Sequence, residues 1–454
     1  MFYRVEGGEV EDLTGRGLKD LRAGLARTPV EPLQTFTDDP LRVLRSVRFA
    51  CRFGLLLDKQ LAFAATSASV TAALDSKVSR ERLGVEVSKM LEGPDPARAV
   101  YLLYSLRLWG VVFRMPPLEQ IHRGDWINGA LITSDVSRFL PAEGIDVAGL
   151  HCALLLHRLT LPSAPTMNLV PPRRSLLWWA GILLPCRHIY TRYKKSSTQT
   201  LVEYMHRESL KGLSLGEAKE IDLCNNSVEA MIGDVRTYDE SNGLDRVSIG
   251  LRVRELRELW RPALLIACAV ELYGDSSLAA ALHAATQTGT VAQGEADGSG
   301  DEPEPEDVAP AADLASSFQP EVDTAFNLTG GMRLPAACSL TLQTRDGPAV
   351  DFGVNFSQAH HDVMQKYASF SVALETAGLH ETWKQKPFFS GKDIMEKLEL
   401  PRGPIVKVYM DKQLHWQLAT PNGTSQECLA HLLEFRARRE GGIKRGCGNV
   451  EANQ

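Results

Sequence analysis

The sequence predicts a mainly α-helical protein, and three observations support this fold class. The stretch Thr35–Gly54 places apolar residues and arginines on different sides of one helix. Residues 29–115 continue in the same helical pattern, and residues 116–285 have the pattern of a longer helical body. A strand signal is clearest at the N-terminus, where Met1–Val5 and Glu9–Leu13 flank a Gly-Gly turn and predict a β-hairpin.

Composition limits the class of protein. The 454 residues are enough for more than one domain, and 44% hydrophobic with 23% charged residues is typical of a soluble globular protein. The net charge of −6 means that any nucleic-acid binding must depend on local basic faces. Eight scattered cysteines without a C-x-x-C pair predict reduced thiols in an intracellular protein of undetermined compartment. No apolar run or leader predicts a membrane partner.

Two adjacent carboxylates, Asp38 and Asp39, precede four arginines that share one helix face. At 100° per residue the arginines span an arc of roughly 120°. A carboxylate accepts from an exocyclic amine and a guanidinium donates to a ring nitrogen, so an Asp/Arg pair three residues apart suits cytosine or adenine. The alternative is a pair of aspartates that caps a helix beside solvated or salt-bridged arginines. The four arginines are Arg42, Arg45, Arg48 and Arg52.

The run D-D-P-L-R-V-L-R-x-x-R-F-A resembles the E/D-D-x-x-R signature of the class II CCA-adding tRNA nucleotidyltransferases, of the poly(A) polymerase-like family and eukaryotic type. The flanking blocks Glu9–Pro29 and Lys77–Leu91 also resemble that family, in the same order. The resemblance implies tRNA as partner and an amino-acid template for CTP and ATP formed by Asp39 and Arg42. The nucleotide-binding residues that it implies are Asp38, Asp39, Arg42, Arg45, Arg80 and Arg82.

The same resemblance places three family blocks upstream of Met1, among them the D-x-D carboxylates that hold Mg²⁺. We therefore expect a chain without its catalytic head, with no catalytic residue and no bound metal, that adds no nucleotide alone. Glu9 and Glu11 are interpreted as a solvated edge. The open alternatives are a truncated gene model, an inactive tRNA- or NTP-binding module, and the C-terminal half of a split enzyme whose head is a separate polypeptide.

The loop Thr14–Asp20 has the pattern of an ordinary turn, and the resemblance implies a mobile joint there. Its expected hinge residues are Gly15, Arg16 and Gly17. Further along, Arg82 and Glu86 are four residues apart on one helix face, and one interpretation is a surface ion pair of small value between them. The resemblance implies the alternative, that this block braces the nucleotide-binding helix and contacts the triphosphate through Arg80 or Arg82.

The resemblance and the composition together predict six segments. The block Trp383–Val408 resembles the tail of eukaryotic CCA-adding enzymes, which implies docking on the tRNA elbow. Four cations are the expected phosphate contacts, chosen by charge and position: Lys384, Lys386, Lys392 and Arg402. The segments are a head remnant (1–28), a helical neck with the template (29–115), a helical body with an insertion (116–285), a disordered acidic linker (286–322), a tRNA-binding tail (323–440) and a flexible C-terminus (441–454).

Overall fold

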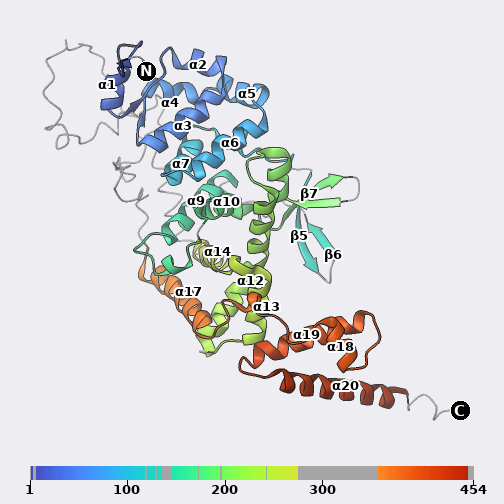
Figure 1. The fold of residues 1–454 in the computed structure, drawn as a ribbon. Coiled ribbons are helices and arrows are strands. Elements are labelled where there is room, and N and C mark those ends of the chain that lie inside the picture. The colour runs from blue at the N-terminus through green and yellow to red at the C-terminus, as the bar shows by residue number, and fades with distance from the viewer. Residues whose placement is uncertain are drawn as a thin grey trace. The chain divides into compact units, whose positions relative to one another are not determined.

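The computed structural model confirms a mainly helical protein, and Figure 1 shows the elements in chain order. Two compact units can be separated. The first unit contains residues 1–167, 172–226 and 269–361. The second unit contains residues 168–171, 227–268 and 362–454. The predicted linker, 286–322, lies outside the described residues. Those residues are 2–3, 7–117, 120–127, 130–134, 145–171, 173–194, 197–241, 243–274 and 356–447.

Two small sheets begin the first unit. Strand β1 (Phe2–Tyr3) pairs antiparallel with β2 (Val10–Glu11), so the predicted hairpin is present. After α1 (Gly17–Arg22), strand β3 (Leu25–Ala26) pairs in parallel with β4 (Leu56–Leu57), which the helical pattern did not predict. A parallel pair requires a crossover connection, and here the crossover carries the next two helices.

Asp39 and Pro40 divide the stretch that was predicted as one helix. The backbone of Asp39 is extended (φ −139°, ψ 95°), the conformation that proline imposes on the residue before it. Helix α2 (Pro32–Asp38) therefore ends and α3 (Leu41–Phe53) begins at this pair, and Gly54 ends α3 with φ +66°. The following helices are α4 (Lys59–Ala65), α5 (Ala68–Lys77), α6 (Arg80–Leu91), α7 (Pro96–Ser105) and α8 (Trp109–Val112).

The range 116–285, predicted as a helical body with an insertion, also contains a four-stranded antiparallel sheet that the sequence analysis did not predict. The strand order is β6–β5–β7–β8. The segment I-Y-T-R-Y-K is rich in β-branched and aromatic residues, which favour a strand. The strands are β5 (Ile121–Ile127), β6 (Ala130–Ser134), β7 (Ile189–Lys194) and β8 (Ser197–Thr200).

Helices α9 (Ile145–Leu159) and α10 (Arg174–Leu183) pack closely within the first unit. A Cβ at Gly181 would lie 2.6 Å from the Ala153 Cα, so only glycine allows this approach. The remaining elements of this part are η3 (Pro165–Leu169), η4 (Leu184–Cys186), α11 (Leu201–Tyr204), η5 (Met205–Ser209) and α12 (Leu215–Ser241), whose last residues belong to the second unit.

The second unit is built from helices, among them α20 (Ser425–Cys447). Helix α20 continues beyond the predicted tail boundary at residue 440 to Cys447; residues 448–454 lie outside the described part. Tyr409, Cys428 and Leu432 are buried between α19 and its neighbours. The other elements that lie wholly or partly in this unit are α13 (Arg246–Leu256), η6 (Arg257–Leu259), α14 (Trp260–Tyr273), α17 (Gln358–Thr376), η7 (Thr382–Lys384), α18 (Gly391–Lys397) and α19 (Pro404–Ala419). The last residues of α14 and the first residues of α17 belong to the first unit.

Candidate functional site

The candidate site begins at the break between α2 and α3. Asp39 Oδ1 accepts a hydrogen bond from the Leu41 N–H at 3.3 Å, and the Asp39 carbonyl accepts from the Arg42 N–H at 3.0 Å. Arg42 Nε lies 3.8 Å from Asp39 Oδ2. Asp39 thus holds the first turn of α3 and keeps its carboxylate beside Arg42, as the spacing in the sequence predicts.

Asp38 has a different environment from its neighbour. Its Oδ1 accepts a hydrogen bond from Gln34 Nε2 at 2.7 Å, across the last turn of α2. Asp38 therefore supports the end of α2, whereas Asp39 lies at the start of α3 next to the arginines.

Helix α6 faces α3 and adds two charged side chains to the site. Arg82 Nη2 lies 3.9 Å from Asp39 Oδ1, and Glu86 Oε1 lies 3.7 Å from Arg45 Nη1. In place of the predicted surface pair between Arg82 and Glu86, Arg82 pairs with Asp39 at the junction of α2 and α3, and Glu86 pairs with Arg45 of α3. The reason is burial: Glu86 is only 4% exposed, so its charge needs close partners inside the protein.

Burial also reduces the number of accessible arginines on α3. Arg48 is buried and its Nε donates to Glu86 Oε2 at 2.6 Å. Leu41, which the helical projection places within the arginine arc, is buried as well. The face that remains accessible carries Arg42, Arg45 and Arg82, whose side chains are 49%, 47% and 55% exposed. With one exposed carboxylate among three exposed guanidinium groups, this face favours an anionic ligand.

Arg80 is directed away from this cluster. Its guanidinium donates to the carbonyls of Val111 (2.7 Å) and Val112 (2.6 Å), and to the carbonyl of Ser209. Burial and the nearby Arg114 lower the pKa of Arg80. The sequence grouped Arg80 with Arg82, but two steps along a helix turn a side chain by about 200°, so the two side chains are directed to different partners.

The expected hinge residues form a well-bonded turn. Gly15 has φ +68°, a conformation that favours glycine, and the Gly17 N–H donates to Thr14 Oγ1 at 3.0 Å. Asp12 accepts from Thr14 and from the Leu18 N–H, and these hydrogen bonds lower its pKa. Gly15 supplies the turn, while Gly17 begins α1.

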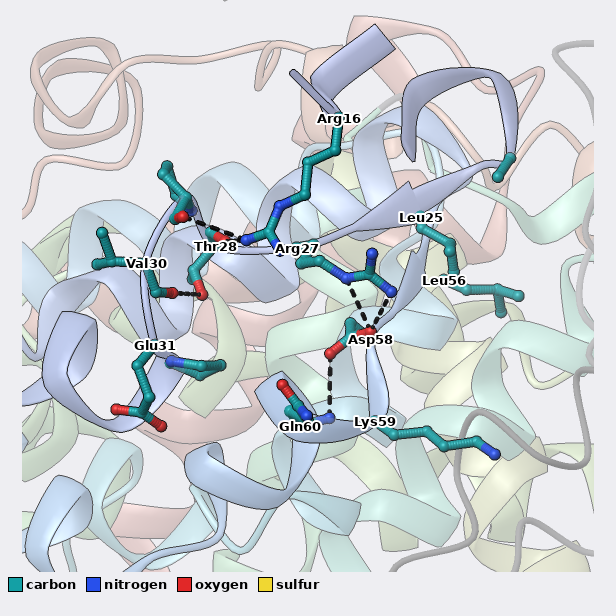
Figure 2. Close-up of a pocket in the computed structure, with 13 residues that line it drawn as sticks. Arg16, Leu25, Arg27, Thr28, Val30, Glu31, Leu56, Asp58, Lys59 and Gln60 are labelled. Atoms are coloured by element: carbon teal, nitrogen blue, oxygen red, sulfur yellow. Dashed lines mark hydrogen bonds and ion pairs between the residues drawn. The ribbon is translucent and has the colours of Figure 1, made fainter. Parts of the chain in front are cut away.

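Arg16 connects this turn to a cavity of about 820 Å³, which Figure 2 shows. Its Nη2 donates to the carbonyls of Thr28 (2.8 Å) and Pro29 (3.1 Å). Across the cavity, Arg27 binds Asp58 at 2.7 Å, and that hydrogen bond raises the pKa of Arg27. Arg16, the middle residue of the expected hinge, thus lines a cavity beside β3 and β4.

The four cations expected in the tail are all exposed in the second unit. Lys384 differs from the others because its Nζ lies 2.5 Å from Glu381 Oε1. Lys392 lies in α18, and Arg402 lies just before α19. The charge of Lys384 is therefore partly satisfied before any ligand arrives.

Comparison with known proteins identifies the family. The mitochondrial CCA tRNA nucleotidyltransferase of Saccharomyces cerevisiae is 48% identical over 442 residues, which cover 95% of this chain and 66% of the yeast protein. The chain belongs to the CCA-adding tRNA nucleotidyltransferase family. The tRNA nucleotidyltransferase cca2 of Schizosaccharomyces pombe is 24% identical over 439 residues, covering 96% of this chain and 68% of that protein. This chain thus spans about two thirds of the length of each yeast protein.

A solved structure is also similar. The crystal structure of the Bacillus stearothermophilus CCA-adding enzyme in complex with CTP is 18% identical, and the match covers 97% of this chain and 72% of that chain with a TM-score of 0.41. No protein-family model matches. The family inferred from three sequence blocks is confirmed by the yeast relatives, whereas the absence of a catalytic head stays a prediction.

The described residues do not fit the Mg²⁺ site that nucleotidyl transfer uses. Among them, no group of three His, Cys, Asp or Glu side chains is placed to hold a metal ion. Asp12, which follows Glu11 in the hairpin, already accepts hydrogen bonds within its own loop. Within the same part of the chain, no helix is both long and apolar enough to cross a membrane.

Sequence reasoning missed two features of the site. It placed Glu86 on the surface, although the pattern L-G-V-E-V puts this residue next to the apolar face of α6. It also overlooked Gly84, at which an added Cβ would overlap the backbone of Leu210 and Gly212. A glycine in the middle of a helix is the signal that indicates such a close approach.

Proposed function

We propose that this chain serves CCA addition to the 3′ end of tRNA and selects CTP and ATP through Asp39 and Arg42. The observation that carries the proposal is the Asp39–Arg42 pair, half-exposed at the start of α3 and 3.8 Å apart. Family membership supports the reaction class. The proposed substrates are CTP, ATP and tRNA.

The selection has a direct chemical basis. Cytosine and adenine each present an amine beside an unprotonated ring nitrogen, which match an acceptor carboxylate and a donor guanidinium. Uracil and guanine present a carbonyl beside a ring N–H, which would oppose like groups of Asp39 and Arg42. A polar group without a partner costs binding energy, so such a site rejects the wrong base strongly.

The phosphates of the nucleotide are assigned to Arg45 and Arg82, with Asp38 as indirect support for the template. Both guanidinium groups are about half exposed and lie beyond hydrogen-bond distance of their carboxylates, at 3.7 Å and 3.9 Å. A triphosphate can therefore recruit them without breaking a short hydrogen bond. Arg80 is not included, since its donors are directed to backbone carbonyls.

The loop at Gly15, Arg16 and Gly17 is proposed as the joint between the template helices and the transfer machinery. The two Arg16 hydrogen bonds to the Thr28 and Pro29 carbonyls must break before this loop can move. The metal-dependent transfer step itself is assigned to carboxylates outside the described residues.

Nucleotide binding by the chain tests this function. We expect CTP and ATP to bind more tightly than UTP and GTP in isothermal titration, by tenfold or more, because only the first pair matches the Asp39–Arg42 edge. Equal affinities for the four nucleotides would show that Asp39 and Arg42 do not read the base.

Binding of tRNA to the tail is tested by its salt dependence. Replacing Lys386, Lys392 or Arg402 with glutamine is expected to lower the slope of log K against log salt by about 1, because each contributes one phosphate contact. The change for Lys384→Gln should be smaller, since Glu381 competes for that charge. Lys366→Gln, which removes a cation paired with Asp239 at 2.8 Å, is the control. Slopes that fall equally in the control would contradict the assignment.

A further inference from the structure

Glu86 is a buried carboxylate shared by two arginines of α3. Its side chain is 5% exposed, and it lies one helical turn after Arg82 on α6. Arg48 Nε donates to Oε2 at 2.6 Å, while Arg45 Nη1 lies 3.7 Å from Oε1. A buried anion requires compensation by close cations, so at least one of these arginines must stay in place.

The two arginines have different tasks. Arg48 is nearly as buried as Glu86 and makes the short hydrogen bond, so it neutralises the carboxylate. Arg45 is 47% exposed, and its Nη1 lies beyond hydrogen-bond distance of Glu86 Oε1. The Glu86 carboxylate therefore attracts the Arg45 guanidinium while the N–H groups of Arg45 stay available to a ligand. Both guanidinium groups also lie over the ring of Phe49, at 4.2 Å for Arg48 and 5.7 Å for Arg45. Arg45 is therefore held in orientation with its outer side accessible.

The position of Glu86 does not depend on α3 alone. Ser88 Oγ donates to the Gly212 carbonyl at 2.8 Å, and Gly84 lies against the backbone of Leu210 and Gly212. At the start of α6, Arg80 binds the carbonyls of Val111 and Val112. Helix α6 is thus anchored at three points along its length, and Glu86 presents a fixed charge to α3.

We propose that Glu86 is a positioning residue for the nucleotide: it orients Arg45 toward the phosphates while Arg48 neutralises it. This inference rests on the proposed nucleotide selection. Glu86 touches no ligand and acts through Arg45. It contributes to affinity for the phosphates and leaves the reading of the base to Asp39 and Arg42.

A double-mutant cycle tests the proposal in the full chain. Glu86→Gln keeps the size of the side chain and removes its charge, and we expect it to weaken CTP binding by about tenfold and to leave cytidine binding unchanged. Arg45→Gln should weaken CTP binding to a similar extent. The double variant should be no weaker than Arg45→Gln alone, because Glu86 acts only through Arg45. Glu81→Gln, the same change at an exposed residue of α6, is the matched control and should bind CTP like the parent.

A second variant controls for loss of folding, because Glu86→Gln leaves the Arg48 guanidinium buried without its carboxylate partner. The combined variant Glu86→Gln/Arg48→Met removes the buried carboxylate and its buried cation together, so neither charge is left unpaired, and it should lose CTP affinity to the same extent as Glu86→Gln. Additive effects, or equal losses for CTP and cytidine, would show that Glu86 is only structural. If the parent binds inorganic triphosphate and loses it on Glu86→Gln, but does not separate CTP from UTP, the base reading fails and the role of Glu86 stands. Binding of neither nucleotide nor triphosphate would overturn both.

Discussion

Replacing Gly84 with alanine is expected to lower the free energy of unfolding by roughly 3 kcal/mol and to weaken CTP binding more than tenfold. The added Cβ would overlap the Gly212 nitrogen and the Leu210 carbonyl oxygen, and both are backbone atoms that cannot rotate away. Helix α6 must then move away from the segment that anchors it. Because Arg82 and Glu86 lie on this helix, their contacts with Asp39 and Arg45 would lengthen at the same time.

The matched control is Gly233→Ala in α12. Gly233 is exposed, and a Cβ there meets no heavy atom within 4 Å. Alanine is the better helix former, so this variant should be more stable by about 0.5–1 kcal/mol. Denaturant unfolding and CTP titration of both variants provide the measurement. Equal stability of Gly84→Ala and Gly233→Ala would refute the claim that α6 is fixed by its contact with Gly212.

Asp39→Ala is expected to reduce the preference for CTP over UTP by roughly tenfold. The carboxylate is the acceptor for the exocyclic amine, and alanine accepts from neither an amine nor a ring N–H. CTP should therefore bind more weakly. UTP should bind no worse, because its carbonyl no longer faces the Asp39 carboxylate. Titration of the variant with the four nucleotides measures the change. A preference that is unchanged would show that Asp39 does not read the base.

Asp39 also stabilises the first turn of α3 through Leu41, so the loss of a helix cap needs its own control. Asp245→Ala serves this purpose, because Asp245 Oδ1 accepts from the Val247 and Ser248 N–H groups at 3.1 Å and caps α13. It should cost about 1 kcal/mol of stability without changing base preference. If Asp245→Ala flattened the preference as well, the effect of Asp39→Ala would be one of stability.

Features that depend on residues within one or two turns of the chain could be predicted from the sequence alone. Gly54 indicated the end of α3, and the spacing of Asp39 and Arg42 predicted that their side chains meet. Three ordered blocks were enough to identify the family. These inferences held because caps, turns and (i, i+3) neighbours depend on residues close in sequence.

Which charged side chains are buried and which remain accessible depends on tertiary packing. Arg48 meets Glu86 across 38 residues, and Arg80 meets Ser209 across 129. No local pattern encodes such a partner, because it is set by how helices pack and by the cost of leaving a buried charge unpaired. The four-stranded sheet also depends on contacts between distant residues, because β5 pairs with β7 although the two strands are far apart in sequence. The sequence thus predicted the Asp39–Arg42 pair, and only packing separated the exposed Arg45 and Arg82 from the buried Arg48 and from Arg80, which binds backbone carbonyls.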